Sequence, residues 1–423
     1  MNTAHQQAPP KKSPVMPALV LGILVIVAAV AYKELQSNPQ KAPPAPTPTG
    51  ASTGSLRVPQ PTLGPVEPRQ EPGVPADATP SPAPGPSVAS PVDPLLDPKD
   101  LVAIVAALTG KEPIAAEQAQ KWKESLQQLI LQKATSVPAI QQFLAQNLDA
   151  SYAGVSGADA LGYNSLRAAL LDALAQIGGA ESIQAMLQIL QTSIFPTDIA
   201  MLAKTLDAQG PGQYQQAILD AVRQQLSLGA LDELGGANVL PLFQVLATEA
   251  ASGAKLDTDL TQYAEKWPYY SSIALAALPD GAGVPSLIQL AQGTVPGNQA
   301  AAAQELAELA PQNTQALSSL LDLAKSEQLP DSILVQLAPF LAGREYELGP
   351  PQDPTAGGYL TFHMANGNED FSASDASGTL TQAQITQRIA IIDQLLQVIP
   401  ATDPATQDAL HGQRNALAAR QQP

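Results

Sequence analysis

The sequence predicts an all-α protein: an α-solenoid of antiparallel helix hairpins, preceded by a transmembrane helix and a disordered Pro-rich linker. Three observations predict this order. An uncharged apolar run lies near the N-terminus, a Pro-rich segment follows it, and apolar residues recur at helical spacing from Leu101 onward. Aromatic residues make up only 4% of the chain, and Ala, Leu and Gln are abundant. Such a composition favours helices.

The apolar run at residues 15–32 is the predicted transmembrane helix. It contains 18 residues without a charge. At a rise of about 1.5 Å per residue, it nearly spans a bilayer core of roughly 30 Å. Lys11 and Lys12 precede it, so the positive-inside rule predicts that residues 1–14 are a short cytoplasmic tail. We therefore expect a single-pass protein of the inner (cytoplasmic) membrane, with its C-terminal domain in the periplasm or another extracytoplasmic space.

The alternative for this run is a cleaved signal peptide. Ala29-Val30-Ala31 has the small-x-small pattern that a signal peptidase accepts. However, the run is longer than the usual hydrophobic region of about 7–15 residues. The cleavage pattern also lies inside the run instead of after it. An uncleaved signal anchor is therefore the favoured interpretation.

Residues 33–99 are predicted to form a disordered Pro-rich stalk. Of the 40 prolines in the chain, 18 fall between Pro39 and Pro98. Such a segment cannot bury enough apolar surface to offset its chain entropy, and it favours extended polyproline II conformations. We expect a passive spacer that holds the following domain away from the membrane, and we favour it over a PxxP docking site.

Residues 100–343 are predicted to form a helical repeat domain. The clearest unit is residues 165–191, in which Gly178-Gly179 separates two amphipathic helices. Further copies are predicted at 271–292 and 301–325, and a single helix at 331–341. The apolar positions of the clearest unit are Leu166, Leu170, Leu174 and Ile177 on the first helix, and Ile183, Met186, Leu187 and Leu190 on the second.

Leu234-Gly235-Gly236-Ala237 and the apolar residues after it also match the turn and the second helix of that unit. Each hairpin is too small to bury its own apolar stripe, so neighbouring hairpins must stack.

This part of the chain resembles the HEAT-repeat family, which grades into armadillo-like repeats. The resemblance covers Leu101 to Gly343. It implies protein–protein scaffolding through a concave surface, and it supplies no catalytic residues. The family's usual Asp in the turn and Arg in the second helix are mostly absent here. The residues that carry the resemblance are Ala168-Ala169, Leu174, Ile177-Gly178, Leu187 and Leu190, with weaker matches at Leu278 and Leu309.

Residues 344–380 interrupt the helical pattern. They begin with a turn-rich Gly/Pro segment, and Asn366-Gly367 is a hairpin turn signal between residues 359–364 and 369–372. We expect an exposed loop, with a short two-stranded β-ribbon as an option. Residues 381–420 return to helical spacing and are predicted to be a C-terminal helical hairpin that caps the array.

Trp267, Tyr269 and Tyr270 form the densest aromatic cluster, and they are the candidate partner-binding residues. Tyr and Trp are frequent in binding hot spots. The alternative is that they pack as wedges at a helix junction.

Few residues offer chemistry. Of the three histidines, His363 lies near Asp370 and Asp375. Asn366, Asn368 and Asp370 have the spacing of a calcium loop, but Phe371 and Ser377 replace its required Gly and Glu. A polar turn is the favoured interpretation.

Glu305 and Glu308 lie one turn apart and are expected to face water. The other histidine of the folded part, His411, is expected on a polar helix face, and His5 precedes the apolar run. No catalytic, cofactor-binding or metal-binding residue is assigned, and no cofactor is predicted.

The charge distribution limits the partners. Residues 98–423 carry 32 acidic and 15 basic residues, whereas residues 1–97 are balanced. An acidic surface disfavours nucleic acids and anionic lipid headgroups. There is no cysteine, which excludes disulfides and thiol catalysis. We therefore expect an extracytoplasmic scaffold or adaptor that binds a protein or peptide and contacts the membrane only through its N-terminal helix. The alternatives are a cell-envelope enzyme or cell-wall-binding factor that uses residues 344–380, and a structural tether without a ligand.

Overall fold

A computed structural model describes residues 96–350, 359–364, 368–400 and 402–421. This part of the chain is 67% helical and contains sixteen α-helices and three β-strands. The prediction of a mainly helical fold is thereby confirmed. None of its helices combines the length and apolar character that crossing a bilayer requires. The predicted tail 1–14, the membrane segment 15–32 and most of the predicted stalk lie outside the described residues.

The helices are separated mostly by short turns. The first one begins at Pro98, whose preceding residue Asp97 accepts a hydrogen bond from the backbone N–H of Lys99 at 2.9 Å. In chain order the helices are α2 (Pro98–Ala106), α3 (Ala116–Leu131), α4 (Val137–Leu144), α5 (Leu166–Ile177), α6 (Gly179–Thr192), α7 (Pro196–Gln209), α8 (Gln215–Ala230), α9 (Leu240–Ala251), α10 (Asp257–Tyr263), α11 (Pro268–Ala276), α12 (Val284–Gln292), α13 (Pro296–Leu309), α14 (Thr314–Lys325), α15 (Asp331–Ala342), α16 (Gln382–Val398) and α17 (Pro404–Ala419).

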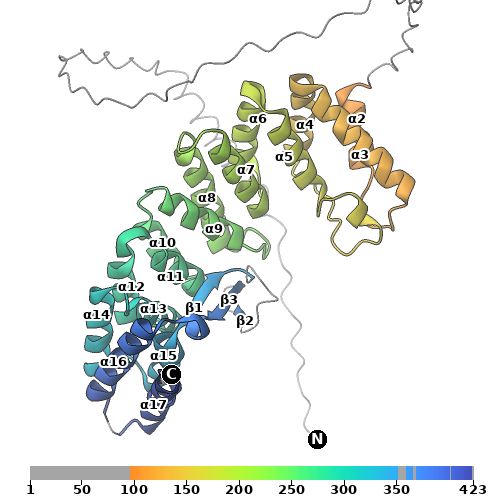
Figure 1. Ribbon diagram of the computed structural model, residues 1–423. Helices are drawn as coiled ribbons and strands as arrows, with labels where there is room; N and C mark the ends of the chain where they lie inside the picture. Colours follow the sequence, from red (N-terminus) through yellow and green to blue (C-terminus); the bar gives the residue numbers. More distant parts are fainter. Residues whose placement is uncertain (1–95, 351–358, 365–367, 401, 422–423) are drawn as a thin grey trace, which may run out of the picture. The chain divides into compact units, whose positions relative to one another are not determined.

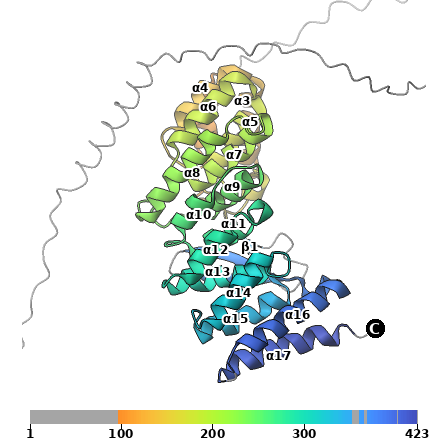
Figure 2. The ribbon, with the colours of Figure 1, turned by 90° about the vertical axis from the view of Figure 1, so that its left-hand side faces the viewer.

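Successive helices alternate between two layers (Figures 1 and 2). The odd-numbered helices α3 to α17 contact one another in order and form what we call the odd layer. The even-numbered helices α2 to α16 do the same and form the even layer. Most helices adjacent in sequence also contact across the layers. Helices inside the array therefore bury their apolar stripes against neighbours in both layers instead of within one hairpin.

Local sequence explains the best-predicted unit, α5 and α6. The Ser165 hydroxyl caps α5 by accepting a hydrogen bond from the N–H of Ala168 at 3.2 Å. Gly178 ends the helix with φ +63°, a conformation that an L-residue with a side chain rarely adopts. A helix hairpin with its break at Gly178-Gly179 is thus confirmed.

The predicted match of residues 234–247 to the second helix of that unit is wrong. The helix after Gly235-Gly236 is α9, which contacts α7 and α11 and so lies in the odd layer with α5. A glycine turn ends a helix in either layer, so the turn alone does not tell which layer the next helix joins.

Residues 344–380 are not an exposed loop. They form a three-stranded antiparallel sheet in the order β1-β3-β2, made of β1 (Arg344–Leu348), β2 (Leu360–Met364) and β3 (Glu369–Asp375). The predicted ribbon corresponds to β2 and β3, with Phe362 opposite Phe371. Strand β1 was not predicted, and it covers the odd layer by contacting α9, α11, α13 and α15. The central strand β3 is buried at Glu369 and at Phe371 to Ala373 because helices lie beneath it.

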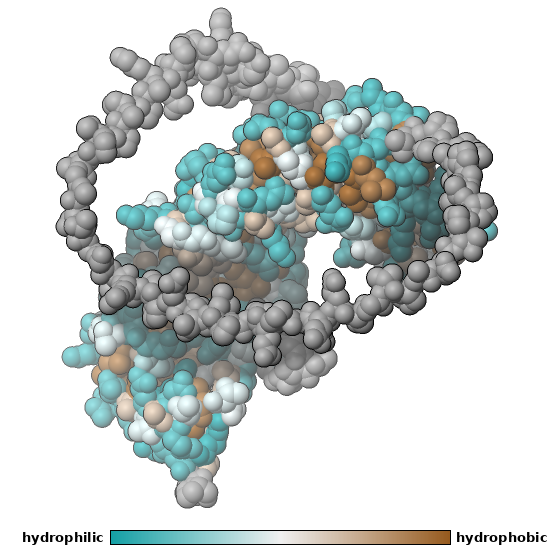
Figure 3. Space-filling model, turned by 45° about the horizontal axis from the view of Figure 1, so that its top comes forward, coloured by the Kyte–Doolittle hydropathy of each residue, from teal (hydrophilic) through white to brown (hydrophobic). Residues whose placement is uncertain are grey.

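The helical array continues beyond the sheet. Helix α16 contacts α14 and α15, and α17 contacts α15, so both extend their layers. The sheet is thus an insertion between α15 and α16. On the face shown in Figure 3, hydrophilic residues predominate and the hydrophobic patches are small.

Candidate functional site

A groove lies between α7 and α9 in the odd layer, and we call it the α7–α9 groove. Its cavity measures about 430 Å³, within the usual range for ligand pockets. Alanines and one valine give it an apolar wall, and charged and amide side chains surround that wall. The lining residues are Ala200, Ala203, Lys204, Asp207 and Ala208 from α7, and Pro241, Gln244, Val245, Thr248 and Glu249 from α9.

Helical spacing explains why these residues share one groove. On each helix the lining positions recur after three or four residues, which places them on one face. Ala200 and Ala203 fill little of the space between the two axes. A longer side chain at either position would occupy the cavity.

Glu249 is the most constrained polar group of the groove. Its side chain is 4% exposed, and its Oε2 accepts a hydrogen bond from Gln215 Nε2 at 3.0 Å. Burial raises the pKa of Glu249, the bond from Gln215 opposes this, and the nearby charge of Asp207 raises the pKa further. A positive charge between the two carboxyl groups would stabilise both ionised forms.

The groove adjoins the inserted sheet. Gln244 Nε2 donates a hydrogen bond to the carbonyl oxygen of Leu348, the last residue of β1, at 3.3 Å. Gly349 follows with φ +91°, and a Cβ there would come within 3.0 Å of Leu240 on α9. Only glycine therefore lets the chain leave β1 this close to the groove.

The predicted partner-binding residues are buried. Trp267, Tyr269 and Tyr270 are 3%, 9% and 0% exposed. Tyr269 stacks on Phe371 with ring centroids 4.6 Å apart, and Tyr270 packs against Phe243 at 5.3 Å. These contacts join α11 to α9 and to the sheet, so packing accounts for all three side chains and we do not place a binding surface there.

Glu305 and Glu308 do not both face water, contrary to the expectation from sequence. Glu305 is 1% exposed, and its Oε1 has no hydrogen-bond partner in the described part of the chain. Burial raises its pKa well above the ordinary value, and the neighbouring Glu308 raises it further. The sheet explains the difference, because the backbone N–H of Tyr346 on β1 donates to Glu308 Oε2 at 3.0 Å. Burial raises the pKa of Glu308 to about 8.

A third buried carboxyl group, Glu369, fixes β3 to α11. Its Oε1 accepts a hydrogen bond from the N–H of Tyr270 at 2.7 Å, in the first turn of α11. In return, the Tyr270 hydroxyl accepts a bond from the N–H of Asp370 at 2.5 Å. Burial raises the pKa of Glu369 to about 7, although the bonds from the backbone of α11 oppose the shift. No pattern in the sequence indicated that Glu369 would be a buried carboxyl group.

The histidine candidates remain on the surface. His363 Nδ1 lies 2.5 Å from Asp370 Oδ1, and the two side chains are 66% and 47% exposed. This pair engages Asp370, one of the three residues with the spacing of a calcium loop, and Asn366 lies outside the described residues. Among the residues that the structure describes, no three His, Asp or Glu side chains are grouped as metal ligands. His411 is exposed on α17.

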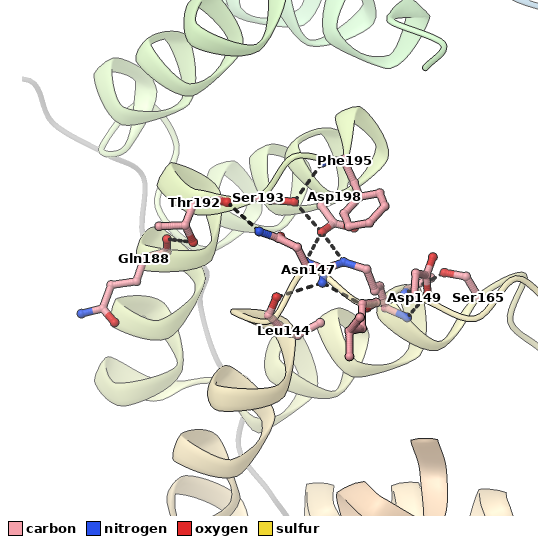
Figure 4. A network of polar contacts seen from close by, with 12 residues as sticks. Leu144, Asn147, Asp149, Ser165, Gln188, Thr192, Ser193, Phe195 and Asp198 are labelled. Carbon is pink, nitrogen blue, oxygen red and sulfur yellow. Dashed lines mark hydrogen bonds and ion pairs between the residues drawn. The ribbon is translucent and has the colours of Figure 1, made fainter. Parts of the chain in front are cut away.

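A polar network that sequence missed surrounds Arg167, which is 1% exposed (Figure 4). Its guanidinium pairs with Asp198 at 2.6 Å and donates to the carbonyl oxygen of Leu144 at 2.9 Å. Ser193 also donates to Asp198, at 2.7 Å. The residues labelled in Figure 4 come from the α4–α5 and α6–α7 connections and from the helix ends that flank them. Because the charge and most of the donors are satisfied, the network holds helices together and offers no open site.

Comparison with known proteins identifies no family. No family model matches the chain, and no curated protein is similar to it. A solved structure from the computational design of self-assembling cyclic protein homooligomers aligns with 77% of this chain and 93% of its own, at 12% identity and a TM-score of 0.11. A TM-score this low carries no argument about fold or function.

Proposed function

We propose that the chain is a membrane-anchored scaffold or adaptor whose acidic, HEAT-like α-solenoid binds a protein or peptide partner on the extracytoplasmic side. The observation that carries the proposal is the unbroken alternation of α2 to α17 between two layers. In such arrays each repeat contacts only its neighbours, and the exposed face of one layer offers an extended binding surface. The α7–α9 groove supplies a cavity on that face.

The distribution of polar groups supports binding instead of catalysis. The carboxyl groups whose pKa values are raised most are Glu305, Glu308 and Glu369. Glu305 and Glu369 are 1% and 0% exposed, and Glu308 is half-buried beneath β1. A substrate would reach them only if the sheet moved away. The groove residues Lys204, Gln244 and Thr248 are exposed instead, and they are typical of a recognition surface.

Site-specific photocrosslinking in native membranes tests the binding proposal. We expect a photoreactive residue at Thr248, in the groove, to capture a partner. The matched control is Gln184 on α6, which lines a similar cavity of about 380 Å³ between α4 and α6 in the even layer. Equal adducts from both positions, or none from either, would contradict the assignment to the odd layer.

The predicted topology has a separate test. The chain has no cysteine, so a Ser318→Cys variant carries one thiol at an exposed position of α14. We expect a membrane-impermeant maleimide to label it in intact cells whose outer barrier has been opened. Labelling only after lysis of the inner membrane would place the domain in the cytoplasm and contradict the proposal.

The exposed His363–Asp370 pair favours a second candidate, a cell-envelope enzyme or cell-wall-binding factor that uses the sheet. Asp370 orients the imidazole at 2.5 Å, as acid–base histidines require. A His363→Ala and Asp370→Ala double variant discriminates between the candidates. If it keeps the Thr248 crosslink but loses sedimentation with purified cell wall, the second candidate is favoured.

A further inference from the structure

We infer that the α7–α9 groove recognises a basic segment of the partner, with one lysine or arginine side chain inserted between Asp207 and Glu249. This inference rests on the proposed binding function and specifies the chemistry of its ligand. It is carried by the shape of the groove, the position of two carboxyl groups in it, and the charge of the whole domain.

The shape suits a side chain with an apolar stem and a polar end. The wall of the groove is built from Ala200, Ala203 and Val245, which offer no hydrogen bonds from their side chains. Lysine and arginine bury such stems along apolar surface while their charged ends reach a polar partner. An aspartate or glutamate has too short a stem to cover this wall.

The polar end would meet two carboxyl groups from different helices. Asp207 lies in the last turn of α7, where its Oδ1 accepts a bond from the N–H of Gly212 at 3.1 Å. Glu249 faces it from α9, 96% buried and still lining the cavity. Its Oε2 is held by Gln215, and no hydrogen bond to its Oε1 is found in the described part of the chain. A buried carboxylate with a free oxygen is stabilised strongly by a cationic donor.

The raised pKa of Glu249 supports the same assignment, because Asp207 and burial both disfavour its charge. The groups that face it are Gln215 from α8 and Asp207 from α7. A bound ammonium or guanidinium would reverse this effect.

Lys204 is the one cation among the residues that line the groove. Its removal provides a second test, in which binding of a basic peptide is expected to become stronger instead of weaker. Lys204 lies one turn before Asp207 and Ala208 on α7, is exposed, and forms no ion pair with the described residues. It therefore competes with an incoming basic side chain. Removing it should strengthen binding of a basic peptide, whereas it should weaken binding of an acidic one.

The charge of the domain points to the same partner. Residues 98–423 carry 32 acidic and 15 basic residues. A field of this sign speeds association with basic segments and repels acidic ones, and salt weakens both effects.

The test uses the full chain in detergent micelles and fluorescence anisotropy of labelled peptides. The probes are extended alanine–glycine peptides with lysine, arginine, norleucine or glutamate at the centre. We expect the lysine and arginine peptides to bind about tenfold more tightly than the norleucine peptide, because charge-assisted hydrogen bonds have that order of strength. The glutamate peptide should bind weakest.

Three variants locate the effect. Glu249→Gln and Asp207→Asn should each remove most of the advantage of lysine over norleucine. Lys204→Ala should strengthen binding of the lysine peptide a few-fold. The matched control is Glu181→Gln on α6, in the even-layer cavity, which should change nothing. Tryptophan fluorescence melting curves check that each variant is folded.

The outcomes separate the two proposals. If the lysine and norleucine peptides bind with equal affinity, and an Ala203→Trp substitution abolishes the binding of both, the inference is overturned. The proposal that the groove binds peptides would then still stand. Tighter binding of the glutamate peptide would also overturn it. Failure of every peptide to bind would overturn the inference and the placement of the binding surface together.

Discussion

Two buried arginines, Arg167 on α5 and Arg388 on α16, both donate to backbone carbonyl groups near the end of another helix, but only one of them has an ionic partner. Arg167, 1% exposed, donates to carbonyl oxygens after α4 and forms an ion pair with Asp198 at 2.6 Å. Arg388, 4% exposed, donates to the carbonyl oxygens of Phe340 and Leu341 at the end of α15, each at 3.1 Å. No carboxylate of the described residues lies within ion-pair distance of it. Burial lowers its pKa, and the more distant charges of Glu345 and Glu308 only partly oppose this.

The difference shows what the inserted sheet does to the array. What we call the Arg167 centre consists of Arg167 and Asp198, which lie between helices and form an ion pair with each other. What we call the Arg388 centre, namely Arg388 with Glu305 and Glu308, lies where β1 covers α13 and α15. The sheet covers the two carboxyl groups, and no ion pair to either is found in the described part of the chain. The buried charges are therefore paired with each other in the first centre, whereas in the second centre the buried arginine and carboxyl groups form no ion pair among the described residues.

The largest expected effect comes from breaking the Arg167 centre. Arg167→Met leaves Asp198 buried without its cationic partner, which should lower the free energy of unfolding by about 3–5 kcal/mol. Urea unfolding of the full chain, followed by the fluorescence of its two tryptophans, measures this. An Arg167→Met and Asp198→Leu double variant should recover much of the loss. Equal losses in both would mean that the carbonyl contacts, not the ion pair, dominate.

The second prediction is a loss of stability with rising pH. Glu308 and Glu369 have pKa values of about 8 and about 7 in the folded chain, above the ordinary 4.5. Raised carboxyl pKa values stabilise the fold fully below about pH 4.5, and this contribution disappears as the pH rises through 7 and 8. We expect the free energy of unfolding to fall by several kcal/mol between pH 5 and pH 8.5, because a difference of one pKa unit corresponds to about 1.4 kcal/mol.

Trp267, directly before the helix α11 that the sheet covers, is the probe for this measurement, in a Trp122→Phe background. A Glu308→Gln and Glu369→Gln double variant should flatten the pH dependence. A stability that rises with pH in the unsubstituted chain would contradict the assignment of these groups.

A gain of stability is expected when the carboxyl group of Glu305, in the Arg388 centre, is replaced by a neutral amide. At pH 8, Glu305→Gln should raise the free energy of unfolding by about 1–2 kcal/mol, because it removes the tendency of a buried, unsatisfied carboxyl group to ionise. Thermal unfolding at pH 5 and pH 8 checks it, since the gain should shrink at pH 5. A loss at both pH values would show that the carboxyl group makes a contact that glutamine cannot replace.

The smallest effect is expected at a partly exposed ion pair. Arg223 and Asp259 join α8 to α10 at 2.7 Å, with side chains that are 34% and 20% exposed. Asp259→Asn should lower the free energy of unfolding by less than about 1 kcal/mol. Added salt should reduce even that. A larger loss would mean that this ion pair of the even layer contributes as much to the free energy of unfolding as the pair of Arg167 with Asp198.

The helices themselves were largely predictable, and the sheet was not. Hydrophobic spacing and the caps at Ser165 and Gly178 are local, so they placed α5 and α6 closely. Strand β1 left a weaker signal, the alternation of Tyr346 and Leu348 with charged residues over five positions. The α7–α9 groove left none, because its small residues become a cavity only when two helices are packed side by side.

By itself, the sequence determined which residues form helices, where most turns fall, and that the folded part is acidic, because these depend on local spacing and on composition. Only the tertiary structure decided which layer each helix joins, and it turned Trp267, Tyr269 and Tyr270 into packing residues. It also buried Glu305, through a strand that begins 39 residues later at Arg344. Burial and pKa depend on contacts between segments far apart in the chain, and no local pattern in the sequence records them.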